Sequence, residues 1–260
     1  ARAYEFGFIP EDQRGLNTGP GAMSVQADMI AQALRGIVNE CELDLANAAK
    51  AACSRAAGTG GTTPFATTTA ALSDARKVLV ENGAPLSDLQ CVLDPTAGSA
   101  VRTLYGINST RDWSQVPMRE QGVLVTPHGV SIRETGQLSS FTKGTGASAT
   151  TDNAGYAVGA VTLTLASAGT GTILAGDVVT FAGDANQYVV KTGDADVSGG
   201  GTIVLQEPGL RIAMSAATKA ITVVATHMKN IVFHRNAIVL ATRLPAAPDG
   251  GDLAIERRQI

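Results

Sequence analysis

The sequence has few aromatic residues and no long apolar run. Phe, Trp and Tyr make up 4% of its 260 residues, whereas hydrophobic residues as a whole make up 44%. A core must therefore be built mainly from aliphatic side chains. No apolar segment approaches the roughly 18 to 20 residues that cross a bilayer, and no signal-peptide pattern opens the chain, so we expect no membrane span.

Cysteine and basic residues are also scarce. Cys41, Cys53 and Cys91 form no C-x-x-C pair, and Cys41 and Cys53 lie about 18 Å apart on one predicted helix, beyond disulfide reach. Scattered cysteines in odd number suit folding in a reducing cytoplasm with buried thiols. A net charge of −3 and no basic arm argue against tight binding of nucleic acid.

The sequence carries no catalytic motif in a suitable context: G-x-S-x-G, H-E-x-x-H and G-x-G-x-x-G are all missing. His227 and His234 would lie on opposite faces of a strand, with no third ligand nearby, and His128 follows Pro127 in an expected loop. We therefore expect no enzyme activity, no cofactor and no metal. Four aspartates that lack calcium-loop spacing are expected in solvated turns: Asp177, Asp184, Asp194 and Asp196.

The segment from Ser24 to about Ala57 predicts one long helix. Apolar residues recur every three or four positions, Ser24 can cap the start, and Gly58 is expected to end the helix. A helix of this length spans roughly 50 Å and suggests an elongated body. A coiled-coil partner helix is the alternative, which the Ala, Asn and Gln flanks disfavour.

The next segment predicts a small α/β layer. A helix is expected over 70–82, a buried strand over 89–93, a turn at Asp94-Pro95 and a helix over 97–105. The tract 142–153 suggests a hinge. Beyond Gly155, short runs of period two between Gly, Asp and Ser turns predict five or six strands and a small antiparallel barrel.

The first 21 residues predict an extended arm. Tyr4, Phe6 and Phe8 alternate, so all three face one side of a strand whose partner we expect upstream of this sequence. A strand with three uncovered aromatics needs either that segment or a neighbouring subunit. An edge strand packed on its own domain is the alternative.

Two phrases resemble the major capsid proteins of tailed bacteriophages. The first has the family pattern F-H-[KR]-[ND]-A-[FI]-x-L-x-T-R and joins the apolar runs 231–233 and 237–241, both expected as strands. It is carried by Phe233, His234, Arg235, Asn236, Ala237, Leu240, Thr242 and Arg243. The second has the pattern N-G-x-P-x-x-D-x-x-x-V-L-[DN]-P. It is carried by Asn82, Gly83, Pro85, Asp88, Val92, Leu93, Asp94 and Pro95.

Two further stretches are similar to the same family. Residues 129–146 resemble its strand-and-exit phrase, although Val130 and Ser139 replace an aromatic residue and a proline. Residues 174–183, with Tyr188 to Val190, resemble the insertion domain of one branch of these coat proteins. Together the resemblances cover most of residues 22–245.

The resemblance implies an α+β Hong Kong 97-like fold with a long spine helix, an α/β axial domain and an inserted barrel. The implied parts are an arm (1–21), a spine-helix and α/β part (22–153), a barrel (154–225) and a return segment (226–260). The implied function is self-assembly into hexamers and pentamers of an icosahedral head. The implied partners are scaffolding and portal proteins and a decoration protein, with only non-specific contact to the packaged double-stranded DNA.

The implied location is the virion, with synthesis in the host cytoplasm. Arg235 and Arg243 are candidate subunit contacts with Tyr4, Phe6 and Phe8, since arginines beside strands often pair with carboxylates across interfaces. A tail, decoration or adhesin protein built around the β-rich half is the alternative, and a hydrolase with an unrecognised site is a third.

Replacing Tyr4, Phe6 and Phe8 with alanine should abolish or greatly weaken shell formation while leaving the monomer folded. Each buried aromatic contributes roughly 1.5 to 3 kcal/mol, and the loss repeats at every subunit. Circular dichroism and sedimentation of the triple variant and the wild type provide the test. Normal shells from the variant would contradict the prediction, and so would a variant that fails to fold.

Overall fold

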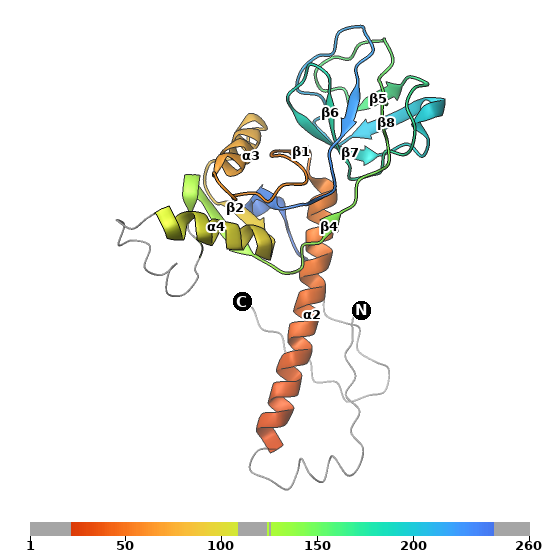
Figure 1. Ribbon diagram of the computed structural model, residues 1–260. Helices are drawn as coiled ribbons and strands as arrows, with labels where there is room; N and C mark the ends of the chain where they lie inside the picture. The colour runs from red at the N-terminus through yellow and green to blue at the C-terminus, as the bar shows by residue number, and fades with distance from the viewer. Residues whose placement is uncertain (1–21, 109–123, 125, 242–260) are drawn as a thin grey trace, which may run out of the picture. The chain divides into compact units, whose positions relative to one another are not determined.

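The computed structural model describes residues 22–108, 124 and 126–241 (Figure 1). The described part combines three α-helices with several short sheets, so the predicted α+β class is confirmed. The chain divides into two compact units, residues 1–40 with 239–260 and residues 41–238. Residues Tyr4, Phe6, Phe8 and Arg243 lie outside the described residues.

Helix α2 spans Ala22–Ala52 without interruption, which confirms the long helix predicted from the apolar stripe. Its end was predicted wrongly. The helix stops at Ala52, five residues before Ala57, and β1 (Arg55–Ala56) follows within three residues. The physical reason is tertiary: the backbone of Arg55 and Ala56 pairs with a strand of the distant β-rich segment.

The α/β layer is a three-stranded sheet covered by α3 (Ala70–Glu81) and α4 (Pro95–Asn108). Strand β2 (Leu89–Leu93) is central, parallel to β3 (Val130–Glu134) and antiparallel to β11 (Ile231–His234). Alternate β2 residues are buried, as period-two patterning requires. The predicted helix 70–82 and strand 89–93 are confirmed.

The expected turn at Asp94-Pro95 is the start of α4. Pro95 is the first helical residue, where its missing N–H is not needed. The Asp94 carboxylate accepts the Thr96 N–H at 3.1 Å, and the Asp94 N–H donates to Asn230 Oδ1 at 2.7 Å. Asp94 is therefore a buried helix cap, and α4 begins two residues earlier than the predicted 97.

The first of the two apolar runs in the phrase around His234 is β11, and the second is not a strand. Residues Arg235–Ala237 form the 3-10 helix η4, and 238–241 have no regular structure. His234 Nδ1 accepts the Asn236 N–H at 3.3 Å, which turns the chain away from the sheet. The prediction of a second strand over 237–241 is therefore wrong.

The β-rich segment forms a sheet in the order β5-β8-β7-β6-β9, with β1 paired to β7. Its strands fall where the period-two runs predict them: β5 (Thr162–Leu165), β6 (Val178–Phe181), β7 (Gln187–Thr192), β8 (Gly201–Leu205) and β9 (Ile221–Val223).

Residues 149–152 join the two edges of that sheet. Thr151 bridges to Leu165 of β5, while Thr150 bridges to Ala220 beside β9. Hydrogen bonding therefore continues around the sheet and closes it into a small barrel. The prediction of a hinge over 142–153 is wrong, because Ala149 and Thr151 are buried and the backbone there is paired.

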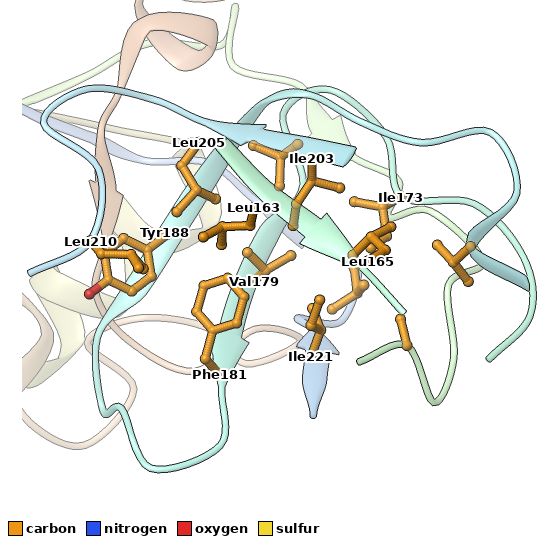
Figure 2. Packing of buried hydrophobic residues seen from close by; sticks show 14 of the residues in the cluster. Leu163, Leu165, Ile173, Val179, Phe181, Tyr188, Ile203, Leu205, Leu210 and Ile221 are labelled. Atoms are coloured by element: carbon orange, nitrogen blue, oxygen red, sulfur yellow. The ribbon is translucent and has the colours of Figure 1, made fainter. Parts of the chain in front are cut away.

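The described residues contain two separate hydrophobic cores. The barrel core is mostly aliphatic and includes the tilted ring pair of Phe181 and Tyr188, whose centroids lie 5.8 Å apart (Figure 2). The core of the α/β layer comprises Phe65, Leu72, Leu89, Cys91, Leu93, Ala97, Val101, Val130 and Ile132. Aliphatic packing in both cores agrees with the shortage of aromatic residues.

The two strands at the base of the barrel pair with each other. The chain leaves β3, passes through β4 (Ser140–Phe141) into the barrel, and returns through β10 (His227–Met228) to β11. Strands β4 and β10 are antiparallel, with Phe141 opposite His227. The barrel is therefore inserted between two strands that flank β2, and we call the β4·β10 pair the neck.

Replacing Cys91 with alanine should reduce the loss of folding stability that occurs as pH rises into the alkaline range. Burial raises the pKa of the Cys91 thiol from 9.0 to about 12. The folded-state pKa is the higher one, so stability is complete below the unfolded value and falls as pH rises through 9 toward 12. Urea unfolding at pH 8 and pH 10.5 measures this difference.

Cys41→Ala is the matched control, because Cys41 is exposed. It should lose as much stability between the two pH values as the wild type, whereas Cys91→Ala should lose less. Desolvation also raises the pKa values of half-buried Cys53 and buried Tyr188, so these two residues keep part of the pH dependence in both variants. Equal slopes for Cys91→Ala and wild type would contradict the prediction.

Candidate functional site

The three histidines lie in separate local settings. His227 Nδ1 is 2.7 Å from the Ala225 carbonyl oxygen, His128 Nε2 is 3.1 Å from Thr69 Oγ1, and His234 caps its own turn. Across residues 22–108 and 126–241, no group of three or more His, Cys, Asp or Glu side chains is arranged to hold a metal ion. The described residues therefore offer no site built on these imidazoles.

Three of the four aspartates have the turn role predicted for them. Asp184 accepts the Asn186 N–H at 2.8 Å, Asp194 accepts the Asp196 N–H at 2.8 Å, and Asp196 accepts the Ser198 N–H at 3.0 Å. Each bond spans two residues and fixes a local turn. These carboxylates serve the backbone of the barrel loops.

Asp177 differs from the other three, and the prediction of a solvated turn is wrong for it. Its side chain is fully buried, with 0% exposure. Oδ1 accepts the Gly144 N–H at 3.0 Å and Oδ2 accepts the Leu174 N–H at 2.7 Å. A buried carboxylate needs such donors, so Asp177 ties the chain entering the barrel to the turn before β6.

Lys229 lies beside this turn. Its Nζ is 3.7 Å from the centroid of the Phe141 ring and donates to the Gly176 carbonyl oxygen. Burial lowers the pKa of Lys229, and its electrostatic interactions with Cys53 and Asp177 oppose that shift. Cation–π contact and hydrogen bonding compensate the desolvated ammonium. The neck and the barrel are therefore joined by polar contacts that no sequence motif marks.

Arg235 is the one predicted contact residue within the described part of the chain. It begins η4, is exposed, and donates its backbone N–H to the Asp88 carbonyl oxygen at 3.1 Å. Asp88 adopts a φ of 53°, an uncommon backbone conformation for a non-glycine residue. The segment around His234 and the segment 82–95, far apart in sequence, therefore meet where Arg235 contacts Asp88.

Helix α2 exposes large apolar side chains in its N-terminal half. Ile30, Leu34 and Val38 have exposed fractions of 55%, 57% and 54%, and they follow one another at a spacing of four residues. Such residues lie on one face of a helix. The sequence predicts an apolar stripe through Ile30 and Leu34, but it does not predict that these side chains are exposed. Periodicity alone does not distinguish a stripe that faces a core from one that forms an interface.

The barrel also exposes an apolar pair that sequence analysis missed. Val158 is 62% exposed and Ile212 is 49% exposed. Val158 lies in a turn and Ile212 in a bend, each two residues from the antiparallel bridge between Tyr156 and Met214. The bridge is formed by residues far apart in sequence, so no local pattern announces the pair.

No protein-family model matches this chain, and no curated protein matches it either. Within the described residues, no helix has the length and apolar character needed to cross a membrane.

Replacing Asp177 with asparagine should destabilise the protein by about 1 to 3 kcal/mol, because one of the two backbone donors would then face an amide N–H₂. Asp196→Asn is the matched control. Asp196 is exposed, and its remaining amide oxygen can still accept from Ser198. Urea unfolding followed by circular dichroism should show a loss for Asp177→Asn alone. Equal stability of the two variants would refute the role given to Asp177.

Proposed function

We propose that this chain is a major capsid protein that self-assembles into the icosahedral head of a tailed double-stranded DNA bacteriophage. The single observation that carries the proposal is the exposed apolar face of α2 formed by Ile30, Leu34 and Val38. The resemblance of the two phrases to the coat-protein family gives the kind of assembly in which that face is covered.

A face of only three apolar side chains suits an assembly in which the same contact repeats in many subunits. Full burial of an aliphatic side chain contributes roughly 1.5 to 3 kcal/mol, so three such residues supply a useful contact energy in each interface. In a closed symmetric shell the same contact repeats in every subunit, and weak individual contacts add up to a stable particle.

The topology supports the same proposal. In the Hong Kong 97-like fold we propose, α2 is the spine helix, the β11-β2-β3 layer is the axial domain and the barrel is the insertion domain. The proposed parts remain 1–21, 22–153, 154–225 and 226–260. The phrase around His234 begins in β11, where the chain returns to the layer after the barrel.

The proposed partners are other copies of the chain in hexamers and pentamers, with scaffolding and portal proteins during assembly. A decoration protein can be accommodated on the outer surface. Contact with packaged DNA would be non-specific, as the net charge of −3 suggests. In this proposal the protein is made in the host cytoplasm, resides in the virion, and acts without enzyme activity or cofactor.

A tail, decoration or adhesin subunit is the second candidate. The exposed Val158 and Ile212 pair favours it, because that pair would let the barrel make the main contact. Closed shells formed by the purified protein would support the capsid proposal, whereas tubes or binding to a preformed particle would support the second candidate.

The double variant Ile30→Glu with Leu34→Glu tests the α2 face. Two charges placed in a buried interface should abolish shell formation, because each would be desolvated without a partner. Glutamate is a good helix former, so α2 itself should persist. Sedimentation velocity and electron microscopy measure assembly, and circular dichroism measures helix content.

The matched control is Gln32→Glu with Asn39→Asp, which adds the same charge at exposed polar positions of the same helix. The control should assemble as the wild type does. Shells from the Ile30/Leu34 variant would exclude the α2 face as the contact, and a wild type that never forms shells would contradict the capsid proposal itself.

A further inference from the structure

The barrel holds the chain that leaves helix α2. Gln206 Nε2 donates to the Ala51 carbonyl oxygen at 2.5 Å, and the Val189 N–H donates to the Ser54 carbonyl oxygen at 3.3 Å. The last carbonyl groups of a helix have no partner within the helix. Here barrel donors serve that end of the chain, so the barrel caps α2.

The same contact continues through β1. Arg55 pairs with Tyr188 and Ala56 with Gln187 of β7, and the Gln187 side chain donates to the Gly58 carbonyl oxygen at 2.6 Å. The backbone from Ala51 to Gly58 is therefore bonded to the barrel at successive points. These bonds are separate from the neck, which joins the barrel to the chain at residues 140–141 and 227–228.

The Arg55 side chain adds a third element to this contact. Its exposure is 3%, its Nη1 lies 2.8 Å from Glu81 Oε2 at the end of α3, and its Nη2 donates to Asn186 Oδ1 in the barrel loop before β7. Asn186 is itself fixed, because its Nδ2 donates to Asp184 at 2.6 Å. One guanidinium thus joins the chain after α2, the α/β layer and the barrel.

Charge explains why this contact is hard to replace. A buried guanidinium must be compensated by fixed acceptors, and Arg55 Nε is buried without a hydrogen-bond partner, so the two Nη groups carry the compensation. The hydrogen bond from Arg55 lowers the pKa of the Glu81 carboxyl. Loss of the guanidinium would create a buried cavity and would leave the Asn186 Oδ1 acceptor without its donor.

We propose that Arg55 holds the C-terminal turn of α2, the end of α3 and the barrel together as one rigid unit. A displacement of the helix end would then displace the barrel as well. The neck pairs two residues of β4 with two of β10. The contacts at residues 51–58 form a second connection between the barrel and the rest of the chain. This mechanical coupling goes beyond the proposed function and holds whatever the protein assembles into.

Pulsed electron–electron double resonance on the full-length chain tests the coupling. One spin label is attached to Cys41, which is exposed on α2, and the other to Val158→Cys on the barrel, in a Cys53→Ser background with Cys91 buried. The variants are Arg55→Met and the matched control Arg133→Met, which removes an exposed arginine from β3. The labelled protein with native Arg55 and the Arg133→Met control should each give a single narrow distance distribution.

Arg55→Met should broaden that distribution and speed amide exchange of residues 53–58 by about tenfold, with exchange in the barrel core unchanged. A broad distance distribution in the protein with native Arg55 would contradict the rigid unit. A narrow distribution in Arg55→Met would contradict the role given to Arg55. If circular dichroism shows that Arg55→Met does not fold, Glu81→Gln replaces it, and the same two outcomes decide.

Discussion

The pairing of β2 with strands on both sides is the constraint on which the rest of the α/β layer depends. β3 follows β2 by way of α4, and β11 reaches β2 only after the chain has passed through the whole barrel. Because both flanking strands belong to one sheet, the two ends of the barrel segment are brought close together. The neck between β4 and β10 then follows from the layer.

A shortage of aromatic residues shapes both halves of the molecule. Aliphatic side chains fill two separate cores, and close packing makes each of them sensitive to the loss of a single group. Short barrel strands need tight turns, which Gly and Asp supply. Asp177 is the exception among these acids, since its buried carboxylate joins two segments and does not serve one solvated turn.

Sequence patterns predicted those helices and strands whose positions are set by local periodicity. The interrupted period-two runs placed β5 to β9, and the three-to-four spacing placed α2. Long-range contacts decided the rest. α2 ends at Ala52 because β7 takes the next residues into its sheet, and 149–152 is strand-like because two distant edges need a partner. The exposure of Ile30 and Leu34 likewise depends on what faces the helix, which one chain's periodicity does not encode.

We propose that copies of this chain cover one another's α2 faces in a closed shell. Cryo-electron microscopy of particles assembled from the purified protein tests it most directly, because the density shows what contacts each side chain. The account predicts closed shells in which Ile30, Leu34 and Val38 are buried against a neighbouring subunit. Particles in which those three side chains face solvent would contradict it.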